Sequence, residues 1–243
     1  MKEKRYFYNG ILKENTSVTI EGEEFHHLTN VMRTRVNERV CIFNGDGNFY
    51  FGSVESISKK SATIYIDTSQ KSPNEPTIKL TLFQALAKGD KLSLIMQKIT
   101  EIGATNLTLF ESSYCDVKSN THKQDRLESI AISAAKQCSR ATIPEINGIY
   151  KINDIANIIK DYDAFYVAYE NEDGHTLYSS IKNSDKKLNN VAIMIGAEGG
   201  FSNEEINLLK QNGADVVSLG KRILRTETAA IACVALISQI LDN

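Results

Sequence analysis

The sequence predicts an α/β protein in two parts, a small N-terminal β barrel followed by a larger domain with a mostly parallel sheet. Residues 17–66 carry short β-branched or aromatic runs bounded by turns, whereas the chain after residue 78 alternates strand-like and helix-like runs. Between these regions lies the polar stretch 69–76, which holds two of the chain's 3 prolines and predicts a linker. We therefore expect one domain at residues 1–72 and a second at residues 73–243.

In the first region, each strand is predicted from a run of residues that favour a pleated, half-buried surface. These runs occupy residues 17–20, 40–43, 49–54 and 62–66, and Asn-Gly-Asp-Gly-Asn at 44–48 predicts a hairpin turn. A short helix is expected over residues 23–32, where Phe25, Leu28, Val31 and Met32 recur at helical spacing. Tyr6, Phe7 and Tyr8 fit the barrel core and the stacking of nucleic-acid bases equally well.

In the second region, apolar strand-like runs alternate with amphipathic helical runs. The strands are expected at residues 79–85, 107–111, 164–169, 191–195 and 215–219. Helices are expected over residues 92–102, 127–138, after Phe201 and over 226–241. The helix after Phe201 begins with a capping box, in which Ser202 caps the Glu205 amide and Glu205 reaches back. The last helix is small and apolar enough to be buried.

Composition and charge exclude several classes of protein. The 243 residues hold 28 basic and 30 acidic side chains, so the net charge of −2 argues against coating nucleic acid by bulk electrostatics but leaves a local basic groove open. No apolar run reaches the roughly 20 residues that cross a bilayer, so we expect a cytoplasmic protein without membrane contact. The 4 scattered cysteines form no CxxC pair, and His26-His27 lacks ligand spacing, so no metal is expected.

Ligands of open α/β sheets bind beyond the carboxyl ends of the strands, so the loops there are the first candidates for a site. Three loops stand out, at residues 170–174, 196–200 and 220–228. Their glycines allow either close approach to a ligand or simply tight turns. The loop Gly-Ala-Glu-Gly-Gly matches neither GxGxxG nor a P-loop, which disfavours a dinucleotide or triphosphate. An acidic residue inside it suits a cationic or neutral adenosyl ligand better.

Two motifs carry a resemblance to a known family. Residues 195–202, IGAEGGFS, and residues 219–229, LGKRILRTETA, resemble the signature of the ribosomal RNA small subunit methyltransferase E family, which belongs to the knotted SPOUT methyltransferases. The likeness extends through residues 84–90, 97–103 and 135–140, and residues 26–33 resemble the family's PUA-like RNA-binding domain. It therefore spans nearly the whole chain.

The resemblance implies a specific activity. It implies S-adenosylmethionine held in a deep trefoil knot, a homodimer, and methylation at N3 of a uridine in 16S ribosomal RNA of the small subunit. The chain departs from the family pattern at Ala87, Ala197 and Lys221, where proline is common, and at Asn37, where glycine is usual. Because asparagine tolerates a left-handed backbone, we expect Asn37 to preserve its turn.

The resemblance also implies which residues build the cofactor pocket, with ordinary core packing as the alternative for the leucines among them. These residues are Ala168, Tyr169, Ile195, Gly196, Glu198, Gly199, Gly200, Leu219, Gly220, Ile223, Leu224, Arg225 and Thr228. As the N3 proton leaves uridine, negative charge spreads onto the ring carbonyl oxygens, and a fixed cation would stabilise it. Arg225 and Arg140 are the catalytic candidates, with phosphate pairing or helix capping as the alternative for each. No general base is assigned.

RNA contacts and other functions remain open at this stage. The candidate phosphate contacts, any of which could instead be an ordinary solvated charge, are Arg5, Arg33, Arg35, Lys88, Lys98 and Arg222. One alternative function is a non-catalytic RNA-binding factor for ribosome assembly. Another is a SPOUT methyltransferase acting on a ribose 2′-hydroxyl or on transfer RNA. A nucleotide-dependent oxidoreductase is disfavoured because the phosphate fingerprint is absent.

Overall fold

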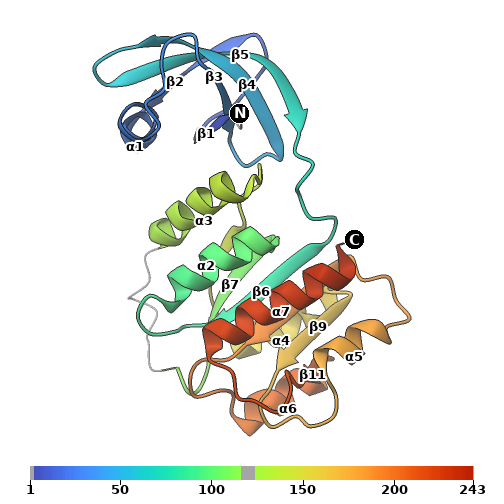
Figure 1. Ribbon diagram of the computed structural model, residues 1–243. Helices are drawn as coiled ribbons and strands as arrows, with labels where there is room; N and C mark the ends of the chain where they lie inside the picture. The colour runs from blue at the N-terminus through green and yellow to red at the C-terminus, as the bar shows by residue number, and fades with distance from the viewer. Residues whose placement is uncertain (1–2, 116–123, 243) are drawn as a thin grey trace. The chain divides into compact units, whose positions relative to one another are not determined.

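The computed structural model describes residues 3–115 and 124–242. It divides into two compact units, shown in Figure 1. Unit 1 comprises Met1–Glu75 with Ala135–Ile143, and unit 2 comprises Pro76–Ala134 with Pro144–Asn243. The boundary expected after residue 72 stays a prediction; the units meet at residue 75, and a second segment of the chain, residues 135–143, belongs to unit 1.

Unit 1 is built on a five-stranded sheet with the order β1-β3-β4-β5-β2. Strand β1 pairs with β3 in parallel, and the other pairs are antiparallel. Four of the strands lie where the sequence predicted them; β1 was not predicted, because it is short and its side chains are mixed. The strands are β1 (Lys4–Phe7), β2 (Thr16–Glu21), β3 (Arg39–Phe43), β4 (Asn48–Ile57) and β5 (Ser61–Lys71).

The hairpin turn between β3 and β4 is confirmed. Gly45 and Gly47 have φ angles of 94° and 90°, a left-handed conformation that glycine adopts without strain. The Asn44 side chain accepts a hydrogen bond from the Asp46 amide at 3.2 Å, and Asp46 accepts one from the Asn48 amide at 2.8 Å. The predicted linker begins too early, since residues 69–71 still pair with β4 as part of β5.

The predicted helix over residues 23–32 is present but is not a regular α-helix. It starts as α1 (Gly22–His26) and continues as the π-helical turn η1 (His27–Val31), in which the Met32 amide bonds the His27 carbonyl at 2.9 Å. The wider turn rotates later side chains away from the α-helical face. Leu28 is therefore fully buried, whereas Val31 is 60% exposed rather than in the core. Asn37 has a φ of 67°, which confirms its left-handed turn.

Each face of the sheet in unit 1 packs against a different partner. One face carries Tyr6, Ile42 and Ile64 in the main core. On the other face, Cys41, Phe43 and Phe49 pack against Ala135 and Ala141. Because successive side chains of a strand point to opposite faces, this alternation divides the two clusters. Residues 135–143 thus complete the core of unit 1.

Two acidic residues hold that segment within unit 1. Glu24 pairs with Lys136 and also accepts a hydrogen bond from the Phe7 amide at 3.3 Å. Glu75 pairs with Arg140 at 3.3 Å and accepts a hydrogen bond from the Ala141 amide at 2.5 Å. The Arg140 side chain is only 4% exposed and that of Glu75 13%. The pair is therefore buried, and each charge depends on the other.

Unit 2 is built on a six-stranded sheet in which all neighbours are parallel, with the order β11-β9-β10-β6-β7-β8. The edge strand β8 was not predicted, because it is mostly exposed and has no apolar run. Strand β11 ends earlier than predicted because the Ser218 amide turns to bond the His175 carbonyl. The strands are β6 (Lys79–Ala85), β7 (Asn106–Glu111), β8 (Glu145–Lys151), β9 (Ala164–Ala168), β10 (Asn190–Ile195) and β11 (Asp215–Val217).

Helices pack on this sheet and confirm the predicted α/β alternation (Figure 1). Helix α7 packs against α2 and α5, whereas α4 packs against α6. Most of the apolar residues of α7, including Ala230, Cys233 and Ile237, are buried as predicted. The helices are α2 (Lys91–Ile102), α3 (Gln124–Cys138), α4 (Ile152–Ile158) with the turn η3 (Ile159–Asp161), α5 (Leu177–Lys182), α6 (Asn203–Gln211) and α7 (Thr226–Leu241).

The buried pair in unit 1 makes a testable contribution to stability. We expect Glu75→Ala to lower the free energy of unfolding of unit 1 by about 3–5 kcal/mol, because Arg140 would keep a buried charge without its partner. Asp67→Asn is the matched control, since the ion pair of Asp67 with Arg39 is exposed and should contribute less than about 1 kcal/mol. Hydrogen exchange of β3–β5 amides measures both losses, and equal losses would contradict the assignment.

Stability of unit 1 should also depend on pH through Glu75. Burial alone would raise the pKa of the Glu75 carboxyl, but hydrogen bonds from Thr142 and the Ala141 amide and the Arg140 charge outweigh it, so the pKa is lowered. Because the pKa is lower in the folded state, ionised Glu75 stabilises unit 1 at pH values above its unfolded-state pKa of about 4.3. This stabilisation is lost as the pH falls through the folded-state pKa. Glu75→Gln should flatten that acid limb in hydrogen exchange measured between pH 3 and 7.

Candidate functional site

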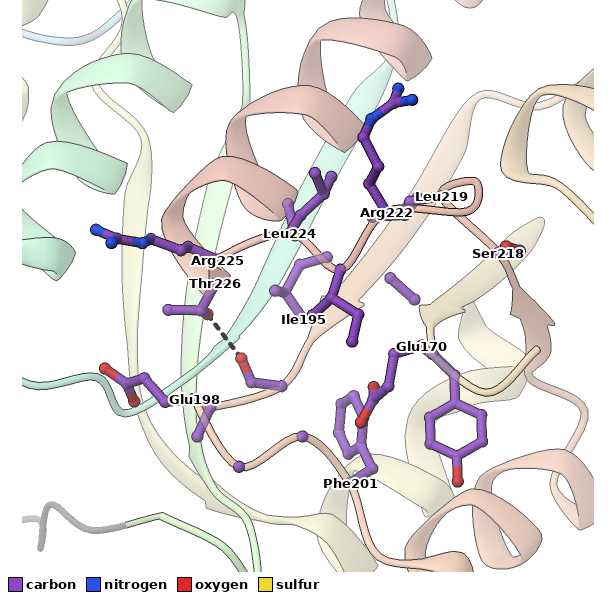
Figure 2. Close-up of a pocket in the computed structure, with 18 of the residues that line it drawn as sticks. Glu170, Ile195, Glu198, Phe201, Ser218, Leu219, Arg222, Leu224, Arg225 and Thr226 are labelled. Carbon is purple, nitrogen blue, oxygen red and sulfur yellow. Dashed lines mark hydrogen bonds between the residues drawn. The ribbon is translucent and has the colours of Figure 1, made fainter. Parts of the chain in front are cut away.

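Three neighbouring strands of unit 2 bring their following segments to one pocket. Strand β9 pairs with both β10 and β11 in parallel, so the carboxyl ends of all three lie at the same edge of the sheet. The segments after them, which begin at Tyr169, Gly196 and Ser218, line a cavity of about 570 Å³ (Figure 2). This volume lies within the range of roughly 300–1,000 Å³ typical of small-molecule sites. The pocket is therefore where the sequence placed it.

A buried hydroxyl ties the two main loops of the pocket together. Thr226, the first residue of α7, donates a hydrogen bond from Oγ1 to the Gly196 carbonyl at 2.7 Å, the contact drawn dashed in Figure 2. The same oxygen accepts a hydrogen bond from Gln84 Nε2 at 2.9 Å, and Gln84 also bonds the Ala85 carbonyl at 3.0 Å. Thr226 is 5% exposed and Gln84 is 0% exposed. The end of β6, the glycine loop and the start of α7 are thus joined.

The glycine loop after β10 lies too close to its neighbours for larger residues. A Cβ on Gly199 would lie 2.7 Å from the Tyr114 Cβ, and one on Gly200 would lie 2.3 Å from Glu170 Oε1. Gly200 also has a φ of +70°, and its amide closes a turn onto the Ala197 carbonyl at 3.0 Å. These glycines are therefore required by packing and backbone conformation.

The predicted capping box begins α6 directly after this loop. Ser202 accepts a hydrogen bond from the Glu205 amide at 3.2 Å, and Glu205 accepts one from the Ser202 amide at 2.8 Å. The second Glu205 carboxylate oxygen accepts hydrogen bonds from the amide and hydroxyl of Ser113 at 2.7 and 2.9 Å. The cap thus also fixes the segment after β7 to the glycine loop.

Charged side chains of both signs line the pocket, and one pair is already formed. Glu198 pairs with Lys91 Nζ at 2.5 Å and accepts a hydrogen bond from the Lys88 amide at 3.3 Å. Burial alone would raise the pKa of the Glu198 carboxyl, but these bonds outweigh it and the pKa is lowered. Glu170 and Arg225 also line the pocket, and within residues 3–115 and 124–242 neither has an ionic partner.

Nearly all of the predicted cofactor residues lie together. The exception is Thr228, which is exposed on α7 and does not line the pocket. The residues that do line it are Ala168, Tyr169, Ile195, Gly196, Glu198, Gly199, Gly200, Leu219, Gly220, Ile223, Leu224 and Arg225. Ile223 is 85% exposed, so it borders the opening rather than the interior. Whether these residues bind a cofactor stays a prediction.

The two catalytic candidates have different surroundings. Arg225 is exposed at the pocket, and its guanidinium points to the same side as Glu198 in Figure 2. Arg140 does not line the pocket; it belongs to unit 1, where it pairs with Glu75 and donates a hydrogen bond to Thr142 at 3.0 Å. These contacts are neither phosphate pairing nor a helix cap, and the catalytic role of Arg140 stays a prediction.

The candidate RNA contacts are dispersed over both units. Arg222 lines the pocket, and Lys88 is exposed in the segment after β6. Lys98 pairs with Glu101 at 2.9 Å. In unit 1, Arg33 and Arg35 are exposed, while Arg5 is half-buried with its guanidinium 5.4 Å from the centre of the Phe49 ring. Their contact with RNA stays a prediction.

Comparison with known proteins decides the family. Residues 73–238 match the model of an RNA methyltransferase domain, and residues 20–67 match the PUA domain of RNA methyltransferases. The chain is 31% identical over 234 residues to ribosomal RNA small subunit methyltransferase E of Bacillus subtilis, covering 93% of this chain and 91% of that protein. The chain belongs to the ribosomal RNA small subunit methyltransferase E family.

Solved structures agree with this membership of the methyltransferase E family. The enzyme of that name from Neisseria gonorrhoeae, solved bound to S-adenosyl methionine, is 27% identical with a TM-score of 0.89, covering 98% of each chain. A methyltransferase of Legionella pneumophila, solved with the same cofactor, is 28% identical with a TM-score of 0.88, covering 99% of this chain and 98% of that one. The α/β fold with a PUA-like N-terminal domain is therefore confirmed.

Several pocket residues of this methyltransferase E family member were not predicted from the sequence. Lys91, Glu170 and Phe201 line the pocket, and Gln84 and Thr226 hold it together. Glu170 carried a signal, because it begins one of the three loops singled out at the strand ends. Lys91 and Gln84 lie more than a hundred residues before the glycine loop. The strand order brings them next to that loop, and local sequence patterns do not predict the strand order.

The hydroxyl of Thr226 can be tested directly. We expect Thr226→Val to lower the free energy of unfolding by about 1–3 kcal/mol, because the Gly196 carbonyl and the Gln84 amide each lose a buried partner while side-chain volume is kept. Thr226→Ser is the control, since it retains the hydroxyl. Urea denaturation measures both variants. A valine variant as stable as the wild type, or a serine variant equally destabilised, would contradict the assignment.

Proposed function

We propose that this protein transfers the methyl group of S-adenosylmethionine to N3 of a uridine in 16S ribosomal RNA. The observation that carries the proposal is the pocket formed by the loops after β9, β10 and β11, which holds both family motifs in one chain of the methyltransferase E family. The PUA-like domain supports an RNA substrate in the small ribosomal subunit. We place this activity in the cytoplasm, where ribosomes are assembled.

The pocket residues fit an adenosyl ligand. Ile195, Leu219 and Leu224 offer apolar side chains to an adenine ring, and the backbone of Gly196 and Gly220 is free of side chains that would keep a ligand away. The Glu170 carboxylate packs against Gly200, where a Cβ would lie 2.3 Å from its Oε1. A mainly apolar lining with a few polar groups is typical of cofactor sites.

Residues of the chain then have separate tasks in the reaction. S-adenosylmethionine, when bound, supplies the sulfonium-activated methyl group. The pocket has to hold the uridine N3 in line with it, because orientation contributes much of the rate enhancement. Arg225 is one of the exposed cations that line the pocket and would stabilise the negative charge that develops on the uracil carbonyl oxygens. Glu198 is held by Lys91 and would orient the ligands rather than accept the proton.

We further propose that RNA is bound by charges in both units. Arg33 and Arg35 are exposed in unit 1, and Arg222 and Lys88 are exposed in unit 2. Arginine and lysine side chains contact phosphates and so position the RNA without reading its sequence. Arg5 and Lys98 belong to the same predicted set, although each already has a partner in the ring of Phe49 and the carboxylate of Glu101.

The chain path and the assembly are also proposals. A trefoil knot is supported by α7, whose first residue is bonded to both β6 and the glycine loop, and which packs on β6 and β10 at the centre of the sheet. A homodimer is supported by family membership, and Ile223, 85% exposed beside the pocket, is an apolar side chain that a second copy would cover. The described residues contain no group of three or more His, Cys, Asp and Glu that could hold a metal ion, and the expected absence of a metal stays a prediction.

Methyl transfer tests the proposal. Purified protein with labelled S-adenosylmethionine should methylate small ribosomal subunits that lack the modification, and mass spectrometry of the nucleosides should find 3-methyluridine. Methylated ribose, or transfer to transfer RNA alone, would replace the proposed target. Binding of RNA without binding of the cofactor would indicate a non-catalytic assembly factor instead.

Arg225 should contribute to the chemical step. We expect Arg225→Ala to lower kcat on the order of a hundredfold, the usual scale for one transition-state donor, because the charge it stabilises develops only as the N3 proton leaves. The affinity for the cofactor should change much less than kcat. Arg225→Lys, which keeps a cation, should recover part of the rate. An alanine variant with the wild-type rate would remove Arg225 from the mechanism.

A further inference from the structure

The pocket contains one carboxylate that the proposed mechanism does not use. Of its two acidic side chains, Glu198 is neutralised by Lys91 at 2.5 Å. Glu170 lines the same pocket, and no cation pairs with it anywhere in residues 3–115 and 124–242. Glu170 is exposed, and an unpaired carboxylate that borders a ligand pocket retains its full capacity to accept hydrogen bonds. Glu170 is therefore available to a ligand in a way that Glu198 is not.

Strand order places Glu170 at the middle of the pocket edge. It lies two residues beyond the end of β9, and β9 is the strand between β10, which leads into the glycine loop, and β11, which leads into the Leu219 loop. A ligand lying across these two loops must cross the end of β9. Glu170 thus meets the central part of such a ligand.

The carboxylate of Glu170 lies against the glycine loop. A Cβ on Gly200 would lie 2.3 Å from Glu170 Oε1 and 3.1 Å from its carboxyl carbon, so glycine at this position leaves room for the carboxylate beside the loop. In Figure 2, Glu170 lies beside Phe201, on the side opposite Arg225 and Glu198. Arg225 is proposed to act where the methyl group is transferred, so Glu170 lies toward the nucleoside part of the bound cofactor.

Carboxylates suit one part of an adenosyl ligand in this position. In the dinucleotide-binding α/β fold, whose glycine loop differs from this one, an acidic side chain after a neighbouring strand hydrogen-bonds a ribose hydroxyl, which shows that a carboxylate at a strand end can take this role. The two oxygens of one carboxylate can accept from two adjacent hydroxyls. We propose that Glu170 accepts hydrogen bonds from the ribose 2′- and 3′-hydroxyls of the cofactor. This inference rests on the proposed function, because it assigns a role within the S-adenosylmethionine site.

Calorimetry with three ligands isolates the contact. The probes are S-adenosylhomocysteine, 5′-methylthioadenosine, which lacks the amino-acid tail, and its 2′-deoxy analogue. The variants are Glu170→Ala and Glu170→Gln, compared with the wild type. Asp173→Asn is the matched control, since it removes the same charge from the same loop but does not line the pocket. Binding is measured on the full chain, without RNA and without turnover.

A ribose contact predicts a definite pattern. Glu170→Ala should lower the affinity for S-adenosylhomocysteine and for 5′-methylthioadenosine by the same factor. That factor should be roughly tenfold to a hundredfold, the range for hydrogen bonds to a charged group. The same variant should lower the affinity for the 2′-deoxy analogue by a smaller factor, because that ligand already lacks one of the two hydroxyls. Glu170→Gln should lie between, and Asp173→Asn should bind all three ligands as the wild type does.

Other outcomes would overturn the assignment in recognisable ways. If only S-adenosylhomocysteine were weakened, Glu170 would contact the amino group of the tail instead of the ribose. If no ligand were weakened, the carboxylate would have no role in binding. These results differ from failure of the proposed function, in which the wild-type protein itself would bind neither S-adenosylhomocysteine nor 5′-methylthioadenosine.

Discussion

The pocket depends on one buried hydroxyl, that of Thr226. It donates to the Gly196 carbonyl at 2.7 Å and accepts from Gln84 at 2.9 Å, so a single oxygen connects the end of β6, the glycine loop after β10 and the first turn of α7. Buried polar groups are usually hydrogen-bonded, and here the Thr226 hydroxyl both donates and accepts, although the Gln84 Oε1 atom is buried without a partner. Both family motifs, which lie some twenty residues apart, are thereby held at one site.

The parallel sheet supplies the frame for that contact. Because neighbouring parallel strands end at the same edge, the segments that follow them meet there even when they lie far apart in the sequence. Lys91 at the start of α2 reaches Glu198 in the glycine loop in this way, and Glu205 joins that loop to Ser113 after β7. Phe201 stacks on Phe110 with ring centroids 6.1 Å apart beneath the loop. Packing and polar contacts therefore fix the loop together.

Local patterns predicted much of this arrangement, and their failures have physical causes. The capping box at Ser202, the turn at Gly45 and the left-handed Asn37 follow from the chemistry of a few adjacent residues, so the sequence predicts them. The exposed edge strand β8 has no apolar run, and the π-helical turn after His26 departs from the period on which the prediction relied. The Thr226–Gln84 contact spans 142 residues, and no local pattern encodes it.

The two arginines predicted as catalytic differ in how their charges are paired. Arg140 is buried, and its pairing with Glu75 and its hydrogen bond to Thr142 offset part of the cost of burying its charge. Arg225 is exposed at the pocket and has no carboxylate partner within the described ranges 3–115 and 124–242. Glu170 likewise has no cationic partner within those ranges. Unpaired charges add little to the stability of the fold. A ligand with charges and hydroxyls of its own can bind to such groups only if they have no partner within the protein. The unpaired groups of the pocket are thus where its chemistry is to be sought.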